Sequence, residues 1–176
     1  MKILLVLNLS QAILDPYSAI YCSEANKILE NIKKASQNYD ITMVVNDQHY
    51  SEMCIEFQYV LPHCYKYGST FPLNRDINKL KSPQVFNKHV LNALSNIHLQ
   101  KSIFGYFPLF QNIEDRKFSL CGFSASTDIV ATALGLIDFL PFKFDVLEDC
   151  LGDASEIQLK LGKDYLRYLN LIPQIP

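Results

Sequence analysis

The chain has 176 residues, of which 49% are hydrophobic and 19% charged, and its formal net charge is -2. This size and composition predict one globular domain over residues 1–176, and the slightly negative charge gives no reason to expect nucleic acid as a partner. No apolar run approaches the roughly 20 residues that a membrane span requires, which excludes a membrane protein of that kind.

The opening apolar run, 3–7, is too short for the core of a signal peptide and is interrupted by Asn8. The chain has five cysteines, an odd number without a Cys-x-x-Cys pair, which favours reduced thiols. We therefore expect a soluble, cytoplasmic protein.

Five short apolar runs predict strands buried on both faces, because their hydrophobicity is continuous rather than alternating. They cover residues 3–7, 41–45, 84–86, 118–121 and 144–147. Apolar residues three and four apart predict helices over 23–36, 126–140 and 155–169. Strand and helix alternate, so the sequence predicts a three-layer α/β/α sandwich around a mostly parallel sheet.

Two long connections are predicted, over 46–83 and 99–117, and connections of this length often carry sites. The second contains the aromatic stretch 104–110. That stretch could line a pocket or contact another subunit, and it could equally be a loop buried in the core.

The first connection contains Asp47 and His49, two positions apart, and His63 fourteen positions later. Two imidazoles and one carboxylate suit a divalent transition metal and leave coordination positions open for water or substrate. Zinc is the first candidate, with iron or manganese as alternatives. A pair of histidines can also be ordinary surface polarity, so the spacing alone leaves both interpretations open.

Five short motifs occur along the chain in a recognisable order. The first strand runs into Asn8-Leu9-Ser10-Gln11, residues 46–51 contain Asp-x-His, and residues 61–64 are Leu-Pro-His-Cys. Residues 121–133 contain a Gly-hydrophobic-small pattern that ends in Thr-Ala, and 146–154 is an apolar strand that ends in an Asp and a small residue. This order resembles the isochorismatase-like hydrolases, and in particular the nicotinamidase branch.

The resemblance implies a catalytic Asp after the first strand, a Lys at the end of the third, and a Cys at the start of the helix after the fourth. The corresponding residues here are Asn8, Lys88 and Asp128, so two of the three identities differ. It also implies substrate-binding roles for Phe123 and Ser124. Lys88 could pair with Asp128 in the former active site or could be an ordinary solvated lysine.

Asn8 cannot take up a proton as an aspartate does, and the Asp128 carboxylate is a poorer nucleophile than a thiolate. The cysteine mechanism is therefore expected to be absent. Cys64, next to His63, is the better candidate for a substitute thiol, whereas Cys121 is expected in the core.

Three functions remain open. The chain could bind a small amide or pyridine-type ligand at the metal without cleaving it. It could hydrolyse an amide or ester with metal-bound water, with Asp128 as base and Lys88 on the developing oxyanion. It could also be a non-enzymatic interaction module that docks through 104–110. The resemblance further implies a homo-oligomer.

Overall fold

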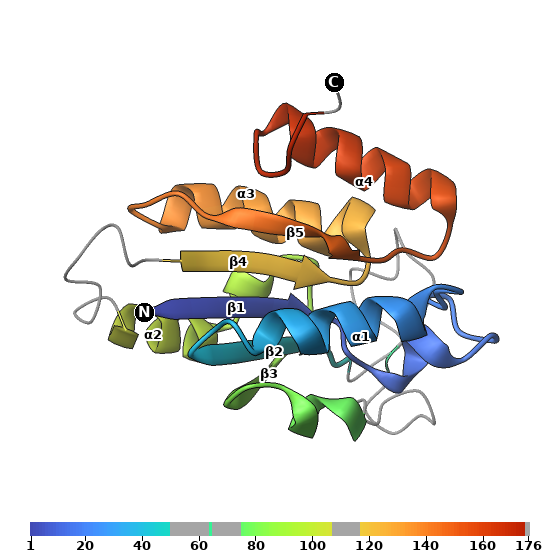
Figure 1. The fold of residues 1–176 in the computed structure, drawn as a ribbon, viewed down its shortest axis with the longest axis horizontal. Helices are drawn as coiled ribbons and strands as arrows, with labels where there is room; N and C mark the ends of the chain where they lie inside the picture. Colours follow the sequence, from blue (N-terminus) through green and yellow to red (C-terminus); the bar gives the residue numbers. More distant parts are fainter. Residues whose placement is uncertain (50–63, 65–74, 107–116, 175–176) are drawn as a thin grey trace.

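The computed structural model describes residues 1–49, 64, 75–106 and 117–174. Its centre is a five-stranded sheet in the order β3-β2-β1-β4-β5, and every neighbouring pair of strands is parallel (Figure 1). The strands are β1 (Lys2–Leu7), β2 (Ile41–Asp47), β3 (Pro83–Lys88), β4 (Lys117–Gly122) and β5 (Asp145–Leu151).

Helices cover both faces of this sheet, which confirms the predicted three-layer α/β/α class. The helix α1 lies on one face and α2 and α3 lie on the other, while α4 packs near the β5 end of the sheet (Figure 1). The α-helices are α1 (Ala25–Ser36), α2 (Ile97–Tyr106), α3 (Val130–Phe139) and α4 (Glu156–Tyr168). The short helical turns are η1 (Gln11–Leu14), η3 (Arg75–Lys79), η4 (Ala93–Ser95) and the π-helical η7 (Ala125–Ile129).

The central strands explain the continuous apolar runs in the sequence. Residues Ile3 to Leu7 of β1 are fully buried, and their alternating side chains contribute to two separate cores. One core lies between the sheet and α1, and the other lies between the sheet and α2, α3 and α4. A strand with helices on both sides has no polar face, which is why its sequence does not alternate.

One predicted connection contains an unpredicted helix. Residues 99–117 were expected to form a connection, but α2 extends to Tyr106, so Phe104 lies on a helix. Only Leu99 and Ile103 of α2 are buried, which leaves too weak an apolar period to reveal a helix in the sequence. The remainder of the aromatic stretch, 107–110, lies outside the described residues.

The strand order of the sheet reverses beside β1. From β1 the chain proceeds outward to β2 and β3, and then returns to the other side of β1 for β4 and β5. In open α/β sheets, ligands bind at the carboxyl ends of the strands where the order reverses in this way. Within the described part of the chain, no helix is long and apolar enough to span a membrane.

Candidate functional site

The ends of three neighbouring strands bring the predicted site residues together. Asn8 follows β1, and its N–H donates to the Val45 carbonyl of β2 at 2.8 Å. Asp47 is the last residue of β2 and is in register with Lys88, the last residue of β3. Parallel pairing therefore places residues that are 80 positions apart in the chain at one edge of the sheet.

Lys88 is the central residue of this cluster. Its side chain is buried, with 1% of its surface exposed, and Nζ donates to Oδ1 of both Asp47 and Asp128. Burial by itself would lower the pKa of Lys88, but the negative charges of Asp128 and Asp47 outweigh it and raise the pKa. The ammonium group therefore stays charged at neutral pH and is shared by two buried carboxylates.

Asp128 lies on η7, the π-helical turn that leads into α3. Turns of this kind are rare and often occur at functional sites. Burial raises the pKa of Asp128, while the charge of Lys88 and the nearby Asn8 amide favour the ionised form. Thr127 Oγ1 also donates to Asp128 Oδ2 at 2.9 Å, so the carboxylate is held from more than one side.

The turn that carries Asp128 is fixed by the residues after β5. The Ser126 N–H donates to Asp153 Oδ2 at 2.7 Å, and the Ala125 N–H donates to the Gly152 carbonyl at 3.0 Å. Gly162 of α4 lies so close that a Cβ atom there would be 2.7 Å from the Ala125 carbonyl carbon. The role of Asp153 was not predicted, and its one signal in the sequence was its place at the end of the apolar strand motif.

Asn8 itself is buried and adopts the left-handed conformation, with φ of 60°. Asparagine is among the residues that tolerate this region. Its amide next to Asp128 can donate or accept a hydrogen bond, but it cannot exchange a proton near neutral pH.

Two of the three predicted metal ligands lie in the same place. Asp47 and His49 are both buried, with 2% and 1% exposed surface, at the carboxyl end of β2. The third, His63, lies outside the described residues. Among the residues that are described, no group of three His, Cys, Asp or Glu side chains could hold a metal ion. A carboxylate and an imidazole fit two positions of a zinc-type donor set, and the role of His63 stays a prediction.

Cys64 also lies at this site. Its carbonyl accepts from the His49 N–H at 3.1 Å, and its Sγ is 3.6 Å from Ser10 Oγ. Burial and the charge of Asp47 raise the pKa of the Cys64 thiol to about 12. The thiol is therefore protonated at neutral pH, which makes it a poor substitute nucleophile. Cys121 lies in the core, as predicted.

Phe123 and Ser124 connect β4 to η7. The Phe123 side chain is buried in the core on the α1 side and faces Gly152, where a Cβ would come within 2.6 Å of the ring. Ser124 is partly exposed, and its carbonyl accepts from the N–H groups of Thr127 and Ile129, both at 3.2 Å. Both residues thus shape the turn before Asp128, and their binding of substrate stays a prediction.

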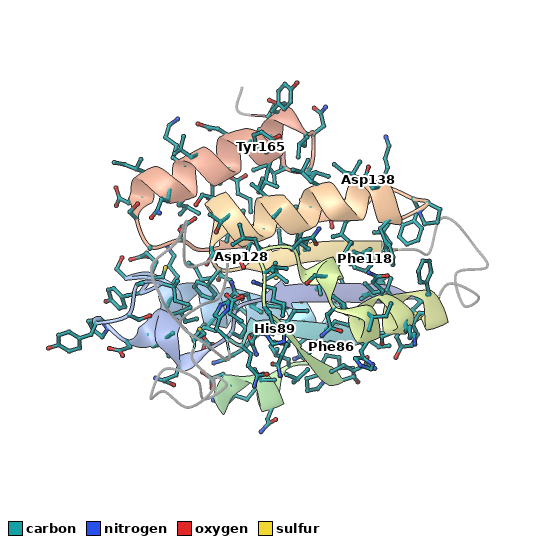
Figure 2. All side chains as sticks on the ribbon, turned by 180° about the vertical axis from the view of Figure 1, so that it is seen from behind. Phe86, His89, Phe118, Asp128, Asp138 and Tyr165 are labelled. Carbon is teal, nitrogen blue, oxygen red and sulfur yellow. The ribbon has the colours of Figure 1, made fainter. Side chains whose placement is uncertain are left out.

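Figure 2 shows this end of the sheet from behind. Asp128 and His89, the neighbour of Lys88, lie toward the carboxyl ends of the strands, while Phe118 lies toward the opposite end. The site therefore lies at the carboxyl ends of the strands, where the strand order reverses.

A scan against protein-family models finds no match to this chain. A search of curated proteins finds none either. Solved structures do match over nearly the whole chain. A pyrazinamidase/nicotinamidase from Streptococcus mutans UA159 has 16% sequence identity and a TM-score of 0.74, with 96% of this chain and 97% of that chain covered.

The pyrazinamidase of Pyrococcus horikoshii, in complex with zinc, has 16% identity and a TM-score of 0.72, with 95% of this chain and 94% of the other covered. An isochorismatase-like hydrolase from Alkaliphilus metalliredigens has 14% identity and a TM-score of 0.70, with 96% and 92% covered. These structures confirm the predicted resemblance for the fold. At such low identity, the chemistry has to be argued from the residues themselves.

Proposed function

We propose that this chain binds a small amide or pyridine-type ligand at a metal site beside Lys88, and that it does not cleave the ligand by a cysteine mechanism. The observation that carries the proposal is the ion-paired cluster of Lys88, Asp47 and Asp128. A carboxylate occupies the start of the helix, where a thiolate nucleophile would be needed.

The residues around Asp128 support the absence of that mechanism. Asn8 offers no base, and Lys88 is engaged with two carboxylates. The nearby thiol, Cys64, has a pKa raised to about 12 and is 1% exposed. Covalent catalysis needs an activated nucleophile within reach of a base, and the described residues at this site do not supply that pair.

The proposed metal ligands are Asp47, His49 and His63. Two observations support this set: Asp47 and His49 are both buried at the carboxyl end of β2, and the His49 N–H donates to the carbonyl of Cys64, which directly follows His63 in the sequence. The zinc in the Pyrococcus horikoshii pyrazinamidase favours zinc, with iron and manganese as alternatives. When bound, such a metal would act as a Lewis acid toward a ligand nitrogen or oxygen.

Metal analysis and calorimetry test this proposal on protein purified without chelator. We expect about one divalent ion per chain, and binding of nicotinamide that is stronger than that of benzamide, which lacks the ring nitrogen. His49→Ala should lose both the metal and the binding. His98→Ala should keep both, because His98 is exposed on α2. Wild-type protein that binds neither metal nor amide would refute the proposal.

Ammonia release from the same amides separates binding from hydrolysis. We expect none above background from the wild-type chain. Release that disappears in Asp128→Asn would instead favour hydrolysis by metal-bound water with Asp128 as base. The double variant Asn8→Asp/Asp128→Cys restores the residue types of the family mechanism beside Lys88, and we expect it to release ammonia faster than the wild type.

A further inference from the structure

Two cysteines that take no part in the proposed ligand site lie on neighbouring strands. Cys121 belongs to β4 and Cys150 to β5, and both side chains are in the core on the α1 side of the sheet (Figure 1). Each cysteine directly precedes one member of the strand pair Gly122 and Leu151. Neighbouring strands are about 4.8 Å apart, and the Cα atoms of a disulfide are roughly 4.4–6.8 Å apart. The pairing of β4 and β5 therefore permits a bond between these two residues.

The two thiols are in direct contact. The S–H of Cys121 donates a hydrogen bond to the sulfur of Cys150. This hydrogen bond lowers the pKa of Cys150, and burial opposes it. Burial raises the pKa of Cys121, and the proton that it donates to Cys150 adds to this effect. Cys150 is therefore the more nucleophilic of the two thiols, and Cys121 lies within reach of its sulfur.

The pairing of β4 and β5 is irregular where the cysteines lie. Leu120 pairs with Val146 and Gly122 pairs with Leu151, so Cys121 alone lies opposite residues 147–150 of β5. Residues in a bulge are left out of the regular hydrogen-bonded ladder. Cys150 can therefore adjust its position toward Cys121 without breaking the regular pairing of the two strands.

A hollow of about 810 Å³ gives access to one of the two thiols. It lies between α1, β5 and the segment after α4, and Cys150 is among the residues that line it. Cys150 is 4% exposed, whereas Cys121 is 0% exposed. Three carboxylates and one ammonium group also line the hollow, those of Asp145, Glu148, Asp149 and Lys34. This excess of carboxylates gives no attraction to an anionic oxidant, so the hollow suits a small neutral peroxide.

We propose that Cys150 and Cys121 form a peroxide-sensitive dithiol, in which Cys150 is oxidised first and Cys121 then closes a disulfide. The Cys150 sulfur attacks one oxygen of hydrogen peroxide, the O–O bond breaks, and the departing hydroxide leaves as water with the thiol proton. The Cys121 sulfur attacks the sulfur of the resulting sulfenic acid, the S–O bond breaks, and a second water leaves with the Cys121 proton.

The reaction is balanced without a further reagent. The two thiols lose two protons and two electrons, and one peroxide is reduced to two waters. Disulfides of intracellular proteins are usually transient, and many of them sense oxidants. The proposal rests on this pair of cysteines and does not depend on the ligand or the metal.

Peptide mapping of the full wild-type chain tests the disulfide without any substitution. The reduced protein, freed of reductant, is treated with a small excess of hydrogen peroxide, and the remaining thiols are blocked with N-ethylmaleimide before digestion. We expect one cross-linked peptide pair that contains Cys121 and Cys150, and dithiothreitol should separate it again. The absence of this pair, or a disulfide between other cysteines in its place, overturns the proposal.

Dimedone, which traps sulfenic acids, tests the order of the two steps. Cys121→Ser should accumulate the adduct at Cys150, whereas Cys150→Ser should show none at Cys121. Cys22→Ser is the matched control and should form the disulfide at the wild-type rate, because Cys22 lies in the same core with a pKa raised by burial. Circular dichroism checks that each variant is folded.

The rates of oxidation in the wild type test the assigned roles independently of the variants. We expect Cys150 to react roughly 10-fold faster than Cys22, since the thiolate is the reactive form and burial disfavours it at Cys22. Equal rates at the two cysteines, or a dimedone adduct at Cys121 in Cys150→Ser, overturn the assignment of Cys150 as the thiol that is oxidised first.

Discussion

Replacing Lys88 with methionine removes the ammonium group that lies between two buried carboxylates. Methionine has a similar length, so the change removes a charge with little change in volume. Asp47 and Asp128 would both lose the cation that they share. The variant therefore measures how much the buried ion-paired cluster contributes to the folded state.

The expected loss is large for a single residue. Removing one partner of a buried ion pair costs about 3–5 kcal/mol, because an uncompensated charge stays buried. For a chain of this size, each kcal/mol lowers Tm by about 2–4 °C, so we expect a decrease of roughly 6–20 °C. Lys79→Met is the control: its partner Asp76 is near the surface, and such pairs contribute about 1 kcal/mol or less.

The loss of stability in Lys88→Met should depend on pH, and the pKa of Asp128 gives the direction of this dependence. Burial already raises the pKa of Asp128, and without Lys88 it should rise further. A group whose pKa is raised by folding binds protons more strongly in the folded state, so it stabilises at low pH and loses this contribution as the pH rises. The deficit of Lys88→Met should thus be greatest at about pH 8 and smaller at about pH 5.

Urea denaturation at several pH values, in the presence of EDTA, measures these quantities. The triple variant Lys88→Met/Asp47→Asn/Asp128→Asn should recover most of the loss, because no buried charge of the cluster remains. If Lys88→Met costs less than about 1 kcal/mol, or the triple variant is as unstable as the single one, then Lys88 does not neutralise two buried carboxylates and the reasoning is wrong.

Three further predictions concern the stability of the fold. Gly122→Ala should lower the free energy of unfolding, measured by urea denaturation, by about 3 kcal/mol or more, because φ is 125° and a Cβ would lie 2.2 Å from a main-chain oxygen of β1. Gly105→Ala is the control: there is open space around Gly105, so this change should be neutral or slightly stabilising. Asp153→Ala should lower the free energy of unfolding by about 1 kcal/mol in the same assay, because the Ser126 N–H loses its acceptor. An unchanged urea midpoint would contradict this. Burial raises the pKa of Tyr39 to about 12, so wild-type stability should fall between about pH 10 and 12, and Tyr39→Phe should show a shallower fall.

The sequence by itself predicted the fold class and the positions of the site residues. Strands buried on both faces have continuous apolar sequences, and all five were found where they were predicted, although β5 is centred beyond its predicted range of 144–147. The predicted boundaries of the elements were less exact, since β5 extends to Leu151. The helix α2 was missed because only two of its residues are buried. The identities of Asn8 and Asp128 also led to the prediction that a cysteine mechanism is absent, and that prediction depends on their chemistry rather than on geometry.

The tertiary structure alone decided how these residues interact. Lys88 is shared between Asp47 and Asp128, and the sequence left open whether it was solvated. Asp153 and Ser10 acquire roles from contacts with residues far away in the chain. The pKa of Lys88 and of Cys64 depends on burial and on neighbouring charges, and both follow from the pairing of distant strands. Local sequence encodes apolar periodicity and residue chemistry, whereas distances across the sheet arise only when the chain has folded.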